Sequence, residues 1–163
     1  MVGNEKIVIS GGGGFIGRHL TRHFAAKGWE VVVLSRQHYE HREGVRFVWW
    51  DGANLDSWAD ELDGAEAVIN LAGRTVNCRY GKKNRQQIYE SRESSTEVIG
   101  EAIAECATPP RVWFNASSAT VYRYALDRDM DEATGEIDPV PESGPRNKWE
   151  FSVDVVNRWE RAL

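Results

Sequence analysis

The sequence predicts an α/β fold in which helices cover both faces of a doubly wound parallel sheet. Short apolar runs alternate along the chain with segments of helical periodicity. The runs are nearly continuous in Val, Ile and Leu, which is typical of strands that are buried on both faces of a parallel sheet. The expected strands are residues 6–10, 30–35, 45–50, 65–71 and 111–116.

A glycine-rich turn follows the first expected strand. Its sequence is Ser10-Gly11-Gly12-Gly13-Gly14-Phe15-Ile16-Gly17, and an amphipathic helix over residues 15–27 comes next. Gly11, Gly14 and Gly17 have the Gly-x-x-Gly-x-x-Gly spacing. Glycine lets the backbone approach a ligand closely, and a helix N-terminus offers unpaired N–H groups and the positive end of the helix dipole. The order of strand, turn and helix therefore predicts a binding site for the pyrophosphate of a dinucleotide.

The later part of the chain contains the remaining expected helices. A long helix over residues 83–106 ends before Pro109-Pro110, a shorter one covers 55–62, and a last one covers 149–163. Residues 127–148 are rich in Asp, Glu, Pro and Gly, which indicates a long surface loop near the ligand crevice. Because the sequence stops inside the last helical pattern, we expect a truncated fold.

Composition favours a small molecule over a macromolecule as the ligand. The 163 residues carry a net charge of −5, with Lys and Arg scattered along the chain, which argues against nucleic acid or a membrane as the main partner. An apolar segment typical of a signal peptide or a membrane span is absent from the sequence, so we expect a cytoplasmic protein. The two cysteines lack the spacing of a zinc site, and His19 and His23 lack a third ligand, so we expect no metal.

The end of the second expected strand predicts which dinucleotide is bound. An NAD site usually places an acidic residue there to bind the ribose 2′-hydroxyl, but this chain has Ser35 and Arg36. A guanidinium makes charge-assisted hydrogen bonds to a 2′-phosphate, so NADP is the predicted cofactor. The alternative is that Arg36 is only a solvated charge at a strand end. On the first interpretation, residues 1–163 form one NADP-binding Rossmann domain, and a substrate-binding part lies beyond residue 163.

Several motifs at the ends of the expected strands resemble one family. Besides the glycine turn, they are Asp51-Gly52, Asn70-Leu71-Ala72-Gly73 and Ser117-Ser118-Ala119-Thr120-Val121-Tyr122. The chain thereby resembles the extended, epimerase-like branch of the short-chain dehydrogenases/reductases. Three further pieces, Arg79-Tyr80, Ser91-Arg92 and Ser95-Thr96, are similar to an atypical NAD-dependent epimerase/dehydratase group, family 39U.

The resemblance implies roles for the matching residues. The implied cofactor contacts beyond the Gly11, Gly14 and Gly17 turn are Phe15, Ile16, Asp51 at the adenine amino group, Leu71, Ala72, Gly73 and Ser117. Ser118 is implied as the residue that bonds the reacting oxygen, with Thr120 second. Each motif also has a purely structural interpretation: Asp51-Gly52 as a turn, residues 70–73 as an ordinary strand-to-helix connection, and the two serines as hydrogen-bonding groups at a strand end.

The chain departs from the family at the proton donor. Catalytic members have Tyr-x-x-x-Lys at the start of the helix after the long loop, whereas this chain has Phe151 and then Val155 or Val156. Arg92 also stands where many extended members have Asn. Tyr122, Tyr124 and Lys148 are possible substitutes, and Tyr122 is the nearest, but packing of Tyr122 under the loop explains its position equally well.

Two functional hypotheses follow from these residues. The first is an NADP(H)-binding oxidoreductase or epimerase acting on a small carbonyl or alcohol substrate, with Ser118, Thr120 and Tyr122 as the candidate catalytic residues. The second is a non-catalytic NADP-sensing regulatory protein, which the missing Tyr-Lys pair favours. The resemblance also implies a homodimer formed by the helices at 83–106 and 149–163, with Phe151, Val155 and Trp159 as an apolar stripe.

Overall fold

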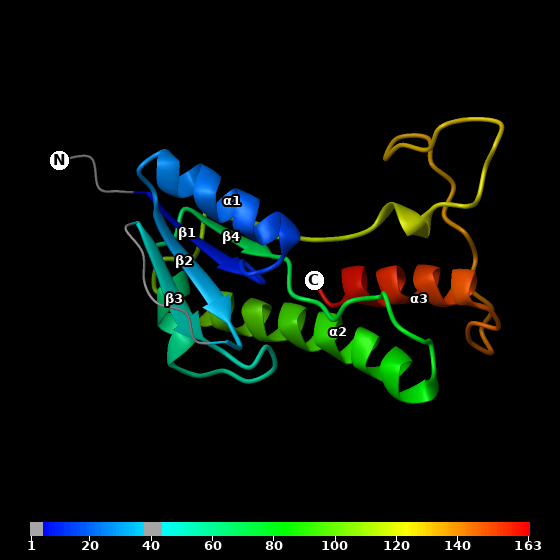
Figure 1. Ribbon diagram of the computed structural model, residues 1–163, viewed down its shortest axis with the longest axis horizontal. Helices are drawn as coiled ribbons and strands as arrows, with labels where there is room; N and C mark the ends of the chain where they lie inside the picture. Colours follow the sequence, from blue (N-terminus) through cyan, green and yellow to red (C-terminus); the bar gives the residue numbers. More distant parts are fainter. Residues whose placement is uncertain (1–4, 38–43) are drawn as a thin grey trace.

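The computed structural model describes residues 5–37 and 44–163, and within them five parallel strands form one sheet (Figure 1). The strands are β1 (Lys6–Ser10), β2 (Glu30–Ser35), β3 (Val45–Trp49), β4 (Ala67–Asn70) and β5 (Val112–Asn115). The α-helices are α1 (Phe15–Ala26), α2 (Lys82–Glu105) and α3 (Lys148–Arg161). The short 3₁₀ segments are η1 (Ser57–Leu62) and η2 (Ala119–Val121).

The strand order β3-β2-β1-β4-β5 creates a switch point in the middle of the sheet. The chain moves outward from β1 to β3, crosses back, and continues outward on the other side through β4 and β5. Connections therefore leave β1 and β4 in opposite directions, and the crevice lies at the carboxyl ends of these two strands, where Ser10 pairs with Asn70. The predicted doubly wound Rossmann-like sheet is confirmed.

Each face of the sheet has its own hydrophobic core, as the alternation of side chains along a strand requires. On one face, α1 contributes Leu20 and Phe24, which pack on the side chains of Ile7, Ile9, Val31, Val33 and Val45. On the other face, α2 and η1 pack on Val8, Val32 and Val68 through Val98, Ile99, Trp58 and Leu62. Figure 1 shows α1 and α2 on opposite sides of the sheet.

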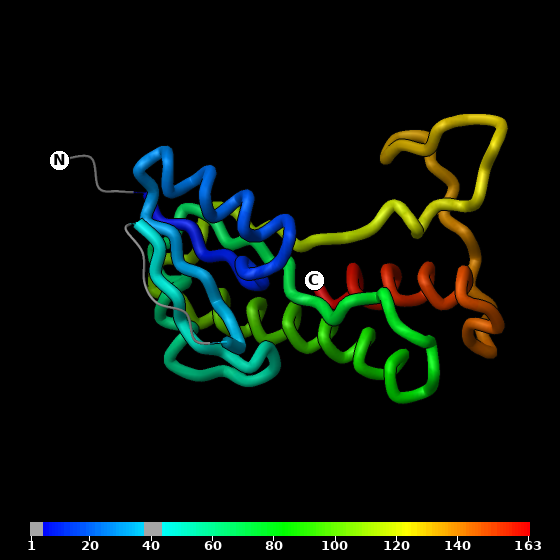
Figure 2. Tube along the Cα trace, viewed as in Figure 1, coloured from blue at the N-terminus to red at the C-terminus, as the bar shows by residue number. Residues whose placement is uncertain are grey.

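Helix α3 packs along α2 and extends beyond the sheet (Figure 2). Phe151 and Val155 are buried against Ile88 and Tyr89 of α2. The Tyr89 hydroxyl donates to Asp154 Oδ2 at 2.6 Å, and burial together with this bond raises the pKa of Tyr89. The α2–α3 pair is therefore joined by apolar packing and by a hydrogen bond.

The packing of α3 corrects one expectation from the sequence. Phe151, Val155 and Trp159 are only 1%, 6% and 6% exposed within this single chain, so they do not form a free apolar stripe. The reason is that Phe151 and Val155 pack on Ile88 and Tyr89 of α2, and Trp159 lies against Arg92 and Thr96 of the same helix. A homodimer stays a prediction, without these residues as its interface.

Several predicted boundaries also change. The expected helix over 55–62 is the 3₁₀ segment η1, which the Asp56 side chain caps at Ser57 N and which ends before Gly64, where φ is +68°. The strands expected over 45–50, 65–71 and 111–116 are each shorter, and α3 ends at Arg161. Between η2 and α3 the chain extends away from the sheet (Figure 2), with an isolated bridge pairing Tyr122 and Ile137.

In the part of the chain that the structure describes, every helix is too short or too polar to cross a membrane.

A buried hydrogen-bond network ties the carboxyl ends of three strands together. Its centre is Asn70, whose Oδ1 accepts from Ser10 Oγ at 2.5 Å and from Ala72 N at 3.0 Å. Asn70 Nδ2 donates to Asn115 Oδ1 at 2.7 Å and to Thr96 Oγ1 at 3.3 Å. One fully buried amide thus joins β1, β4, β5 and α2 directly beneath the crevice.

We predict that Asn70→Ala lowers the free energy of unfolding by about 3 kcal/mol, because the buried groups around it lose their partners. Urea denaturation measures this loss. Thr21→Val is the matched control, since Thr21 Oγ1 is buried and has no hydrogen-bond partner among the described residues. Its removal should leave the free energy of unfolding unchanged or raise it. Equal losses in the two variants would contradict the role given to Asn70.

Candidate functional site

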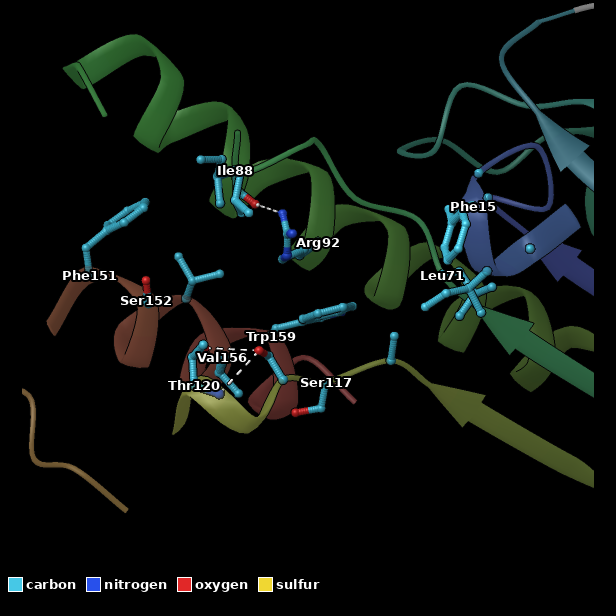
Figure 3. A pocket seen from close by; sticks show the side chains of 18 of the residues that line it. Phe15, Leu71, Ile88, Arg92, Ser117, Thr120, Phe151, Ser152, Val156 and Trp159 are labelled. Carbon is cyan, nitrogen blue, oxygen red and sulfur yellow. Dashed lines mark hydrogen bonds between the residues drawn. The ribbon is translucent and has the colours of Figure 1, made fainter. Parts of the chain in front are cut away.

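A cavity of about 570 Å³ opens at the carboxyl edge of the sheet. Its walls come from the glycine turn, the end of β4, the segment after β5, and the facing sides of α2 and α3 (Figure 3). The predicted site residues that line it are Gly11, Gly14, Phe15, Ile16, Gly17, Leu71, Ser117, Ser118 and Thr120. The structure therefore brings together the glycine turn and the serine motif, which lie about a hundred residues apart in the sequence.

The three glycines of the Gly-x-x-Gly-x-x-Gly spacing have different roles. Gly11 has φ of +71°, and a Cβ there would lie 2.8 Å from Leu71 O; a Cβ on Gly17 would lie 2.5 Å from Gly11 O. Both positions exclude a side chain because the turn packs against itself and against the end of β4. A Cβ on Gly14 would meet only Gly11 O, at 3.2 Å. Gly14 is thus the glycine that the protein's own packing requires least.

The N-terminus of α1 is open toward the cavity. Gly14 is the N-cap, and no described side chain caps it or adds an acidic group to the first turn. By contrast, Asn147 caps α3 by accepting from Trp149 N and Glu150 N, both at 2.9 Å. Among the described residues, the first N–H groups of α1 therefore have no side-chain cap, as a phosphate-binding helix end requires. Phe15 and Ile16 beside them are 76% and 60% exposed, which suits residues that a bound cofactor would cover.

Ser118 and Thr120 form a hydroxyl pair in the cavity wall. Their Oγ and Oγ1 atoms lie 3.1 Å apart, and Thr120 N donates to Ser118 Oγ at 3.3 Å. Ser117 also lines the cavity, and its hydroxyl donates to Glu160 of α3. The pair is exposed to the cavity because Ser118 is the N-cap of η2, at the point where the chain leaves the sheet.

Tyr122 lies outside the cavity wall. Its ring occupies the space beside Gly135, where a Cβ would come within 2.5 Å of Tyr122 Cε1, and its backbone pairs with Ile137. The structure thus has the arrangement that the sequence left as the alternative, with Tyr122 packed under the loop. Tyr124 is 70% exposed beside Trp149, and neither Tyr124 nor Lys148 lines the cavity.

The residues at the ends of β2 and β3 lie away from this cavity. Ser35 Oγ accepts from Gln37 N at 3.0 Å, and Arg36 is exposed with no ion-pair partner in residues 5–37 and 44–163. Asp51 accepts from Asn54 Nδ2 at 2.6 Å and from the backbone N–H groups of Asn54 and Ala53, which lowers its pKa. The turn role of Asp51 is therefore present, and its contact with adenine stays a prediction.

The turn after β4 contacts both the start of the glycine turn and α2. Leu71 lines the cavity and donates its N–H to Ser10 O at 3.1 Å, while Ala72 N is bonded to Asn70. Gly73 lies against the Arg92 guanidinium, because a Cβ at Gly73 would be 3.2 Å from Arg92 Cζ.

The α3 wall of the cavity is mostly apolar. Phe151, Ser152, Val155 and Val156 line it, and Ser152 Oγ donates to Lys148 O at 3.0 Å. The sequence of α3 has no Tyr-Lys pair. The α3 side of the cavity is therefore lined by neither a phenol nor an ammonium group.

Two cavity residues, Tyr80 and Arg92, were not among the site residues predicted from the sequence: both were noted in family motifs, and Arg92 also as a departure from the usual Asn. The Tyr80 ring lies 5.1 Å from that of Phe151, and Arg92 lies 5.1 Å above the Trp159 ring. Helical periodicity places Arg92 on a face of α2, but no sequence signal indicates that α3 closes over that face.

Comparisons with known proteins show which family the chain is similar to. The family profile described as NAD dependent epimerase/dehydratase family matches residues 7–147. Epimerase family protein SDR39U1 from Bos taurus is 28% identical over 160 residues, which is 96% of this chain and 48% of that protein. Epimerase family protein SSP1921 from Staphylococcus saprophyticus is 30% identical over 158 residues, 96% of this chain and 49% of that protein.

A solved structure of an epimerase family protein is also similar to this chain. The crystal structure of human epimerase family protein SDR39U1 (isoform 2) with NADPH matches at a TM-score of 0.74 and 28% identity, covering 96% of this chain and 48% of that chain. The chain spans about half the length of these relatives. The resemblance drawn from the strand-end motifs is confirmed, and the chain belongs to the NAD-dependent epimerase/dehydratase family.

Proposed function

We propose that this chain binds NADP(H) and forms the cofactor half of an oxidoreductase or epimerase that acts on a small carbonyl or alcohol substrate. The observation that carries the proposal is the open N-terminus of α1, which faces the same cavity as the Ser118 and Thr120 hydroxyls. The glycine turn and the first N–H groups of α1 would hold the pyrophosphate. The NADPH in the human relative's structure supports this cofactor class.

The choice of NADP over NAD rests on the end of β2. Ser35 and Arg36 stand where an NAD site has an acidic residue, and the Arg36 side chain is exposed. A guanidinium that has no ion-pair partner within residues 5–37 and 44–163 suits the 2′-phosphate of NADP.

The catalytic part of the proposal concerns the hydroxyl pair. A nicotinamide cofactor, when bound, supplies hydride transfer. Ser118 and Thr120 would orient the oxygen of a carbonyl or carbinol by hydrogen bonding, and the apolar α3 wall would exclude water from it.

The second candidate is a non-catalytic NADP-sensing protein. The observation that favours it is the α3 wall, where Phe151 and Val155 or Val156 take the place of the family's Tyr-Lys pair. NADPH oxidation with any member of a panel of small carbonyl compounds would support an enzyme. Tight NADPH binding with no turnover across the panel would support the sensor.

We predict that Gly14→Ala weakens NADPH binding at least about tenfold while the unfolding temperature stays near that of the wild type. A methyl group at this position projects beside the α1 N–H groups but meets only one protein atom, Gly11 O. Gly17→Ala is the comparison, because its methyl group would clash with Gly11 O and Gly12 Cα at 2.5 Å and should lower the unfolding temperature. Unchanged NADPH affinity in Gly14→Ala would place the cofactor elsewhere.

Arg36→Ala tests the cofactor preference. A charged hydrogen bond contributes about 1.5–3 kcal/mol, so the wild type should bind NADP at least about tenfold more tightly than NAD, and the variant should lose this difference. Titration calorimetry with both dinucleotides gives the two affinities. The NADP assignment is wrong if the wild type binds both equally well.

Ser118→Ala should slow a demonstrated NADPH-dependent carbonyl reduction at least about tenfold, the lower end of the range for general acid–base groups, with NADPH affinity preserved. Single-turnover loss of NADPH absorbance measures the rate. Tyr122→Phe distinguishes Tyr122 from Ser118 among the three sequence candidates: a slow Tyr122→Phe variant beside an unaffected Ser118→Ala variant would mean that Tyr122 reaches the substrate and that Ser118 does not.

A further inference from the structure

Arg92 is the single charged residue among the described residues that line the cavity. The rest of the lining is glycine, apolar and aromatic side chains, and a few hydroxyls. Figure 3 shows Arg92 extending from α2 toward Trp159 on α3, with Phe15 at one end of the cavity and Phe151 at the other. The cation therefore lies in the middle of an otherwise uncharged chamber.

The Arg92 guanidinium is held in one orientation by its neighbours. Nη1 donates to Arg74 O at 3.2 Å and to Ile88 O at 3.1 Å. Cζ lies 5.1 Å above the Trp159 ring, which is itself fixed because Trp159 Nε1 donates to Thr96 Oγ1 at 3.1 Å. Gly73 lets the turn after β4 pass directly against the guanidinium. These contacts position the group without neutralising its charge.

No carboxylate in residues 5–37 and 44–163 forms an ion pair with Arg92, whereas several other arginines of the described chain have such partners. Arg158, also stacked on an aromatic ring, pairs with Glu93, and Arg46 pairs with Glu30 and Glu61. Burial lowers the pKa of Arg92, because partial withdrawal from water disfavours the charged form of the guanidinium. A partly buried cation without a counter-charge is costly, and an anion that enters the cavity would remove that cost.

We propose that Arg92 binds an anionic group of the substrate, so that the cavity selects small molecules that carry a carboxylate or phosphoryl group on an apolar body. This inference rests on the proposed function, since it takes the cavity as the substrate site beside the cofactor. The planar guanidinium has five N–H donors, and its two hydrogen bonds within the described residues use only Nη1, which leaves Nε and Nη2 for a forked contact with an anion. The apolar α3 wall would cover the rest of the ligand.

The test compares charged and neutral probes of the same shape. Phenylpyruvate and phenyl phosphate are titrated against the protein with and without saturating NADPH, beside the uncharged methyl ester of phenylpyruvate. We expect at least one anion to bind the wild type about tenfold or more tightly than the ester, and Arg92→Gln to abolish that advantage. Arg92→Lys keeps the charge and should retain part of it.

Arg85→Gln is the matched control. Arg85 also lies on α2 and stacks on a ring of α3, at 4.8 Å from the Phe151 centroid, but it does not line the cavity. This variant should keep the preference for anions. Because NADPH affinity is measured in every variant, the outcomes separate: a wild type that binds no NADPH contradicts the proposed function, whatever the anions do.

Two results would overturn the inference about Arg92. In the first, the anions bind no better than the neutral ester. In the second, Arg92→Gln weakens NADPH as strongly as the anions, which would assign Arg92 to the cofactor's phosphates. In Arg92→Gln, an unchanged NADPH affinity together with a lost preference for anions would support the inference that Arg92 binds the substrate's anionic group.

Discussion

The buried amide of Asn70 is the constraint on which the rest of the site depends. A parallel sheet leaves the carboxyl ends of its strands with unpaired groups, and here one side chain connects β1, β4 and β5 at that edge. Through Thr96 the same network reaches α2, and through Trp159 it reaches α3. The strand ends, α2 and α3 are thus held in place relative to one another by hydrogen bonds. These bonds are shielded from water, so water does not compete for their donors and acceptors.

The glycine turn shows how the same residues serve folding and binding. Gly11 and Gly17 permit contacts with Leu71 O and Gly11 O that no side chain could allow, so they set how closely β1, β4 and α1 approach. This close approach points the α1 N-terminus at the cavity. Gly14 is less constrained by packing, and its lack of a side chain keeps the space beside the helix end open.

Local patterns predicted the sheet, the glycine turn and the strand-end motifs, because each depends on residues adjacent in sequence. The five strands, α1 and the grouping of Gly11 to Gly17 with Ser117, Ser118 and Thr120 follow from that information. The expectation that Phe151, Val155 and Trp159 form an apolar stripe at a dimer interface was wrong, since these side chains are buried within the single chain. The η1 segment was too short for its periodicity to separate an α-helix from a 3₁₀ turn.

Arg92 and Tyr80 were the harder residues to assign, and the reason is physical. Their places in the cavity depend on how α3 closes over α2, which is set by contacts between segments some sixty residues apart, such as Tyr89 with Asp154. The packing of α3 on α2 also decides which side chains of the two helices line the cavity. At the α3 positions where the family resemblance implies a phenol and an ammonium, this chain has Phe151 and valines, and the cavity's cation lies on the opposite wall, at Arg92. The open helix end is present, and the polar side chains that line the cavity come from α2, from the segments after β4 and β5 and, with Ser152, from α3.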